Sequence, residues 1–142
     1  IDAPLSLPGV YRKLSGFKNY HFRQADLEAR AMSPMFLGGL AARAIELKGK
    51  LEELGCEVCE TFPRILANEM QLKDKGYKTH QMSLKDCRSL ICNLFKDPIK
   101  VNPKDIKTWH HLDALMALMS AMKYEQGQCK SFGDVEEGEI YV

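Results

Sequence analysis

Hydrophobic residues recur at helical spacing near the middle of the chain. The positions, each three or four residues after the last, are Leu40, Ala44, Leu47, Leu51 and Leu54. Gly55 follows where a helix C-cap belongs. This pattern predicts an amphipathic helix over residues 40–54.

The second half of the chain predicts further helices. An apolar stripe runs from Leu84 to Phe95, and Ser83 with Asp86 has the spacing of a capping box. Residues 109–122 are apolar on almost every face, which is typical of a buried helix. One or two helical turns are expected over 64–70, a polar linker over 72–81, and helix starts at Asn102-Pro103 and Thr108.

Three short segments predict strands. Residues 1–5 are mainly apolar, residues 56–62 alternate, and residues 140–142 end an acidic tail. Residues 6–36 show no sustained period, which predicts a long loop with a short helix over 24–31. This order indicates an α/β fold, which we interpret as a single domain over residues 1–142.

Composition narrows the class of protein. With 142 residues and a net charge of +1, a non-specific nucleic-acid coat protein is not expected, because each neutralised phosphate needs a basic residue. No apolar run is long enough to span a bilayer, and residues 1–5 show neither the basic region nor the cleavage site of a signal peptide. Five cysteines form an odd set, which favours reduced thiols and a cytoplasmic location.

Asp113 is the first candidate for chemistry. It lies within the apolar helix, where an unpaired carboxylate would cost several kcal/mol or become protonated. His110 precedes it by three residues and so lies on the same helix face. The structural alternative is that Asp113 bonds a nearby backbone N–H or pairs with a basic side chain.

Two further carboxylates lie at predicted strand ends. Asp2 precedes a proline turn, at the rim where α/β sheets place ligands, although it could also cap that turn. Glu60 lies in the alternating segment and points either to the same edge or to solvent.

The long loop carries basic residues interleaved with Tyr and Phe, a pattern that suits a phosphate backbone and stacked bases but also an ordinary solvated surface. These residues are Arg12, Lys13, Lys18, Arg23 and Arg30, of which we assign Arg12, Lys13 and Arg23 to substrate binding. Cys56 and Cys59 point to opposite faces of a strand and have no second ligand pair, so we do not expect a zinc site.

Four blocks in this order resemble the DUF429 family, predicted nucleases of the ribonuclease H-like superfamily. They are residues 1–8 (IDAPLSLP), 60–64 (ETFPR), 110–115 (HHLDAL) and 133–140 (GDVEEGEI). The resemblance implies a ribonuclease H-like sheet flanked by helices, of which this chain is the C-terminal portion. It also implies that the first strands, with the superfamily's central Asp, precede Ile1.

The resemblance further implies metal-assisted hydrolysis of phosphodiester bonds. Asp2 and Asp113 would be ligands of Mg²⁺ or Mn²⁺, because carboxylate oxygens suit hard cations. His110 would be a ligand or a proton carrier, as in the Holliday-junction resolvase branch, and Glu60 an additional site residue.

Two other interpretations of the sequence stay open. One is a non-catalytic binding or regulatory domain that keeps the ribonuclease H-like scaffold. The other is a mostly helical bundle in which a basic side chain pairs with Asp113. For partners we expect nucleic acid as the substrate, no membrane, and either self-association or a complementing chain segment.

Overall fold

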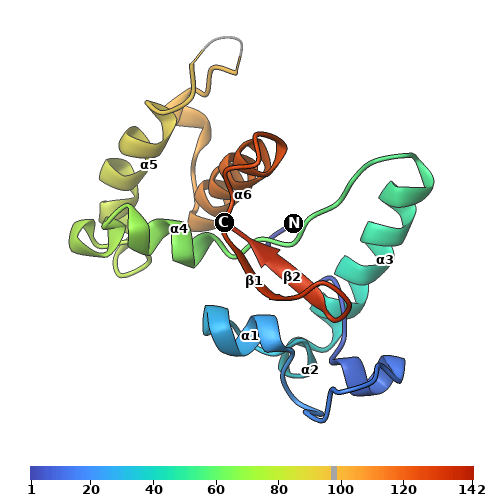
Figure 1. Cartoon of the computed structure of the whole chain (residues 1–142). Coiled ribbons are helices and arrows are strands. Elements are labelled where there is room, and N and C mark those ends of the chain that lie inside the picture. Colours follow the sequence, from blue (N-terminus) through green and yellow to red (C-terminus); the bar gives the residue numbers. More distant parts are fainter. Residues whose placement is uncertain (97–98) are drawn as a thin grey trace. The chain divides into compact units, whose positions relative to one another are not determined.

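The chain folds into two compact units, and the computed structural model describes residues 1–96 and 99–142 (Figure 1). Unit 1 comprises residues 1–62 and 120–142, and unit 2 comprises residues 63–119. The architecture is mixed α/β, rich in helix, with a small antiparallel sheet. The expected α/β class is confirmed at this level, whereas the ribonuclease H-like sheet and the single domain stay predictions.

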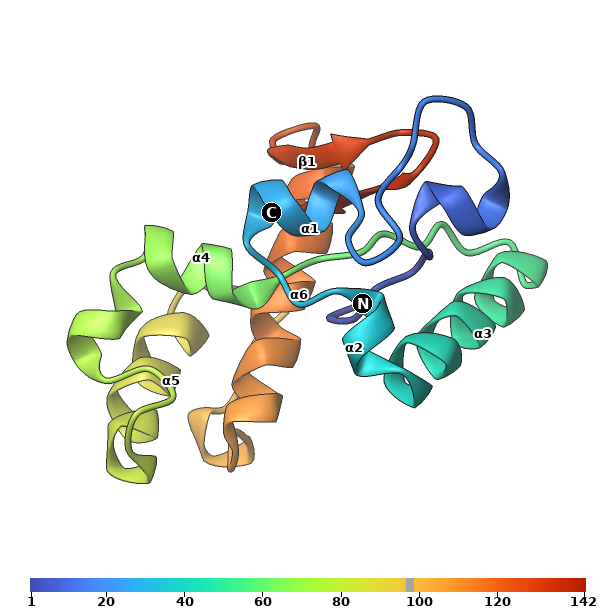
Figure 2. The ribbon, with the colours of Figure 1, turned by 90° about the horizontal axis from the view of Figure 1, so that it is seen from below.

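A β-hairpin anchors unit 1. Strands β1 (Ser131–Asp134) and β2 (Gly138–Tyr141) pair antiparallel, and helix α1 (Gln24–Ala29) packs against β1 (Figures 1 and 2). The packing is close because Gly133, at φ +105°, has no side chain: a Cβ there would lie 2.6 Å from the Cβ of Ala25. The predicted strand at the end of the acidic tail is confirmed.

The segment around Glu60 pairs on both sides. The Tyr141 N–H donates to the Glu60 carbonyl (2.9 Å), within a parallel bridge between Glu60 and Ile140. On the other side, the Ile1 amino group donates to the Cys59 carbonyl (2.8 Å), and the Thr61 N–H donates to the Ile1 carbonyl (2.9 Å). These two bonds flank Glu60 in the pattern of parallel pairing.

This pairing corrects two predicted strands. Neither residues 1–5 nor residues 56–62 form a strand; Ile1 and the residues around Glu60 make single-residue pairings instead. Pro4 and Pro63 lack a backbone N–H, so neither ladder can be extended through these positions. Alternation alone did not carry this information, because it reports which residues share a face and not where a partner strand lies.

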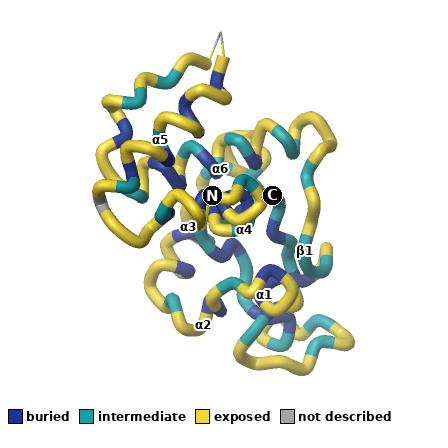
Figure 3. Tube along the Cα trace, turned by 90° about the vertical axis from the view of Figure 1, so that its left-hand side faces the viewer, coloured by how far each residue is buried: buried dark blue, intermediate teal, exposed yellow. Residues whose placement is uncertain are grey.

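The expected long loop contains short elements. It includes a 3₁₀ turn over Gly9–Arg12, α1, which confirms the predicted short helix, and the start of α2 (Pro34–Leu37). Helix α3 (Gly39–Glu53) follows and confirms the helix predicted over 40–54. Its buried positions are Ala41 and Ala44, whereas the leucines of the predicted stripe at 40, 47 and 54 are exposed. Figure 3 shows the burial of the described residues along the trace.

Unit 2 consists of helices joined by 3₁₀ turns. Its elements are α4 (Pro63–Glu69), the turns Leu72–Lys75 and Gln81–Ser83, α5 (Leu84–Cys92), the turn Pro103–Asp105, and α6 (Trp109–Glu125) as far as Met119. The largest fully buried apolar side chains of this unit are Leu72, Ile91, Leu112 and Met116. The helices predicted from residue 84 and from residue 109 are confirmed.

The predicted helix caps of unit 2 have different outcomes. Thr108 Oγ1 accepts from the His111 N–H (3.3 Å), and Asn102 Oδ1 accepts from the Lys104 N–H (3.0 Å), so both caps form. Ser83 makes no side-chain cap, because the preceding 3₁₀ turn leaves it in helical geometry (φ −69°, ψ −16°). The predicted capping box at this position is therefore wrong.

Among the described residues, the longest and most apolar helix falls short of what a membrane crossing requires.

Substitution of Gly133 by Ala is expected to lower the free energy of unfolding by about 2 kcal/mol or more, because it adds steric overlap to a positive φ. Gly127→Ala is the matched control: its φ is +66° but nothing lies within 4 Å of the added Cβ, so about 1 kcal/mol is expected. Urea unfolding followed by circular dichroism measures both. Equal losses would contradict the close packing of α1 on β1.

Candidate functional site

Asp113 lies buried in α6 of unit 2, and two consecutive residues satisfy its two carboxylate oxygens. The Tyr77 hydroxyl donates to Oδ1 (2.5 Å), and the Lys78 ammonium lies 2.6 Å from Oδ2. The Asp113 side chain is 5% exposed, whereas the Lys78 side chain is 46% exposed. A buried carboxylate is thus balanced by a cation that reaches it from the surface.

The backbone before this pair explains why both side chains reach one carboxylate. Gly76 (φ +78°) ends the turn Leu72–Lys75, and the Tyr77 N–H bonds back to the Leu72 carbonyl (3.0 Å). Lys78 also has a positive φ of +57°. The Tyr77 ring packs edge-on against Trp109 (5.4 Å between centroids), which holds its hydroxyl toward α6.

His110 lies one turn before Asp113 on α6, as the sequence predicts, and its side chain is exposed. The next residue, His111, accepts a hydrogen bond from the Lys107 N–H at Nδ1 (3.2 Å). Asp2 is exposed and belongs to unit 1, whereas Asp113 and His110 belong to unit 2. The roles assigned to these three residues stay predictions.

Glu60 lies in unit 1, where its carboxylate forms a bidentate ion pair with Arg23. Arg23 Nη1 and Nη2 donate to the two Glu60 oxygens at 2.7 and 2.6 Å, and the Leu5 N–H donates to Oε2 (2.7 Å). Such paired, charge-assisted bonds are among the strongest in proteins. The structure therefore gives Glu60 a clear role in joining three segments, and a further catalytic role stays a prediction.

Arg23 itself is fully buried, which the sequence did not indicate. Its remaining donors bond Asp26, at 2.6 Å from Nη2 to Oδ1, and Ser6 Oγ at 3.0 Å from Nη1. Burial alone would lower the pKa of the guanidinium, but the hydrogen bonds and charges of Glu60 and Asp26 outweigh it and raise that pKa. Arg23 was expected on a basic surface; it is instead part of the interior of unit 1, where two carboxylates compensate its charge.

The two other residues assigned to substrate binding are exposed. Arg12 Nη1 donates to the carbonyls of Glu136 (2.7 Å) and Glu137 (3.3 Å), which fixes the turn Gly9–Arg12 to the hairpin. Lys13 follows in a left-handed conformation (φ +57°). Tyr11 and Tyr20 lie nearby in an edge-on pair and are 48% and 61% exposed.

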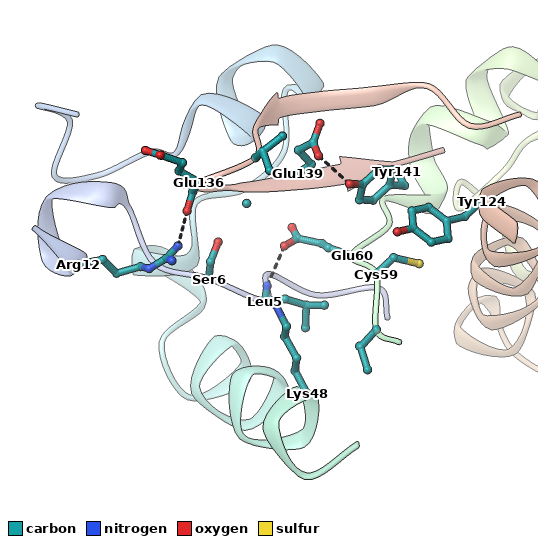
Figure 4. Close-up of a pocket in the computed structure, with 13 residues that line it drawn as sticks. Leu5, Ser6, Arg12, Lys48, Cys59, Glu60, Tyr124, Glu136, Glu139 and Tyr141 are labelled. Carbon is teal, nitrogen blue, oxygen red and sulfur yellow. Dashed lines mark hydrogen bonds between the residues drawn. The ribbon is translucent and has the colours of Figure 1, made fainter. Parts of the chain in front are cut away.

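A pocket of about 240 Å³ lies within unit 1 (Figure 4). Its wall includes Glu60, the Tyr124 phenol from α6, and Glu139 and Tyr141 from β2. The hydrogen bond to Glu57, together with burial, raises the pKa of Tyr124 to about 12. A hydrogen bond to Glu139 (2.6 Å), followed by burial, raises the pKa of Tyr141 as well, so both phenols stay protonated donors at neutral pH.

The donors around Asp113 and Glu60 decide whether either carboxylate suits a metal ion. No group of three His, Cys, Asp or Glu side chains that could hold a metal ion occurs among the described residues. Asp113 supplies the carboxylate oxygens that suit a hard cation, and the cation on its Oδ2 is the half-exposed Lys78, so the donor type fits Mg²⁺ or Mn²⁺. Glu60 does not fit, because the fully buried Arg23 takes both of its oxygens.

Sequence reasoning missed the partners of these carboxylates. Tyr77 and Lys78 fell in the predicted polar linker, and Asp26 fell in the predicted short helix without a role. Glu137, placed in an acidic tail, is buried and accepts from the N–H groups of Gly9 (2.7 Å) and Gln24 (2.6 Å).

The chain belongs to the family described as protein of unknown function (DUF429), whose model matches residues 35–138. The family expected from the sequence is therefore confirmed. No curated protein and no solved structure matches the chain.

Replacing Arg23 by Met is expected to lower the free energy of unfolding by about 3–5 kcal/mol, because Asp26 and Glu60 then stay buried without their cation. Adding Glu60→Gln should restore part of this loss, since one uncompensated charge disappears. Urea unfolding of the single and double variants measures the coupling.

Arg43→Met, which removes an exposed Arg on α3, is the control and should change the free energy of unfolding by less than about 0.5 kcal/mol. A similarly small change for Arg23→Met would contradict the buried ion cluster.

Proposed function

We propose that this chain hydrolyses phosphodiester bonds of nucleic acid with the help of Mg²⁺ or Mn²⁺, with Asp113 as the metal ligand of unit 2. One observation carries the proposal: Asp113 is a buried carboxylate whose charge is balanced by the half-exposed ammonium of Lys78. The family membership and the resemblance of residues 110–115 to the ribonuclease H-like helix motif support it.

The contacts of Asp113 define what this chain would contribute. Tyr77 holds Oδ1 by its hydroxyl and so fixes the carboxylate orientation, while Oδ2 faces a cation that can withdraw to the surface. When bound, a divalent cation supplies an activated water and charge stabilisation of the leaving oxygen. His110, exposed one helical turn away, is suited to accept or deliver a proton at its imidazole.

Asp2 is the second ligand that the resemblance implies. It belongs to unit 1, so the experiments treat it separately from Asp113. Arg12 and Lys13 are the exposed basic residues proposed to hold the substrate backbone there.

Titration of Mn²⁺ by calorimetry tests the ligand role. Asp113→Asn is expected to lower Mn²⁺ affinity about tenfold or more, and Asp2→Asn to lower it as well. Asp105→Asn, an exposed carboxylate of the same unit, is the control and should leave the affinity unchanged. Unchanged affinity in Asp113→Asn would refute the proposal. Cleavage of labelled DNA and RNA oligonucleotides by the same variants then tests hydrolysis.

Replacing Lys78 by Met gives a second test that needs no activity. Without metal, the variant should lose about 1–3 kcal/mol of unfolding free energy, because Asp113 keeps its burial but loses its cation. Saturating Mn²⁺ should stabilise Lys78→Met by about 2 kcal/mol or more, and more than the wild type. Adding Asp113→Asn to this variant should abolish the difference; its persistence would show that the metal binds elsewhere.

A second function, non-catalytic binding, is favoured by one observation. Both oxygens of Asp113 already have partners, so this carboxylate is satisfied without a metal. In that case Asp113→Asn changes stability but neither Mn²⁺ affinity nor cleavage, which distinguishes the two functions.

A further inference from the structure

A basic pocket lies within unit 2, outside the contacts of Asp113. It has a volume of about 340 Å³ and is lined by Met82, Leu84, Lys85, Arg88 and Lys107. Three of these five side chains are cationic, and no acidic residue belongs to the lining among the described residues. An open pocket with this composition favours an anion.

Two structural links bring the three cations together. Lys85 and Arg88 lie one turn apart on α5, so their side chains share a helix face. Arg88 Nη1 donates to the Ile106 carbonyl (3.0 Å), which holds the segment containing Lys107 against α5. The cluster is therefore built by the fold of unit 2 rather than by chance proximity of long side chains.

The Arg88 side chain also has one N–H group that lacks a hydrogen-bond acceptor among the described residues. This group is the buried Nε–H. A buried donor without a partner costs about 1–3 kcal/mol. Phosphate oxygens are suitable acceptors for a guanidinium, which presents its N–H groups in a planar fork.

The distribution of charge favours an extended anion over a small one. Unit 2 contains ten Lys and Arg against six Asp and Glu, whereas unit 1 contains ten against thirteen. The nearly neutral chain thus divides into an acidic and a basic unit, and most of the basic residues of unit 2 lie outside the pocket. A single phosphate would use only the pocket, whereas a chain of phosphates would use both.

We propose that the pocket lined by Lys85, Arg88 and Lys107 binds a backbone phosphate of a nucleic acid. Lys85, Arg88 and Lys107 supply the positive charge of the lining, and the Nε–H without an acceptor belongs to one of these three side chains. The exposed Met82 offers an apolar surface beside the phosphate for a sugar or base. The choice of nucleic acid as ligand rests on the proposed function, whereas the affinity for phosphate rests on the pocket alone.

Fluorescence anisotropy of a labelled single-stranded oligonucleotide with the full chain, in EDTA, tests this proposal without metal chemistry. The double variant Lys85→Gln/Arg88→Gln is expected to weaken binding about tenfold or more. It should also lower the slope of log affinity against log salt by about one for each lost phosphate contact.

The matched control is Lys73→Gln/Lys96→Gln, which removes the same charge from unit 2 at exposed residues that do not line the pocket. It should weaken binding by less than about threefold. Thermal unfolding followed by the fluorescence of Trp109 verifies that both double variants keep unit 2 folded. Equal weakening by the two double variants would overturn the pocket as a site.

Two further arms separate the sources of phosphate and the two proposals. Titration with inorganic phosphate should compete with the oligonucleotide only weakly; binding of phosphate without binding of the oligonucleotide would overturn the nucleic-acid assignment. The second arm compares the oligonucleotide binding of the wild type in EDTA with its Mn²⁺ binding and its cleavage activity. If Mn²⁺ binding and cleavage fail while this binding persists, the proposed function falls and the phosphate pocket stands.

Discussion

The buried guanidinium of Arg23 is the interaction on which unit 1 depends. Its donors reach Asp26, Glu60 and Ser6, and Glu60 in turn accepts from the backbone of Leu5. Glu137 repeats the arrangement on a smaller scale by joining the backbone of Gly9 and Gln24. A larger sheet would hold these segments together by ladders of backbone hydrogen bonds. Here buried carboxylates hold them, and each carboxylate is stable in the interior only when all of its hydrogen-bond donors are present.

Unit 2 buries one carboxylate by a different arrangement. Asp113 has a neutral hydroxyl donor on one oxygen and a half-exposed ammonium on the other. The cation paired with Glu60 is fully buried, whereas the cation paired with Asp113 is half-exposed. Glu60 therefore holds the fold of unit 1, and the proposed replacement of Lys78 by a metal cation concerns Asp113.

The sequence predicted the helices better than it predicted which side chains pair with the buried carboxylates. Periodicity identified the helices that begin near residues 40, 84 and 109, because the 3.6-residue repeat is local. The same reasoning selected Asp113 and Glu60 as unusual carboxylates. It could not identify Tyr77 or Arg23 as their partners, since these lie 36 and 37 residues away. Arg23 in particular was assigned to the surface because it lies among other basic residues, interleaved with Tyr and Phe, in the predicted loop.

The division of charge between the units has a consequence for how the molecule meets other molecules. The isoelectric point is close to neutrality, yet the two units carry formal charges of opposite sign. A polyanion is attracted by a basic unit and repelled by an acidic one, so the two units would meet the same polyanion at different rates. Added salt weakens these long-range forces, because the Debye length is about 10 Å at 0.1 M, and the rate of encounter is therefore sensitive to ionic strength.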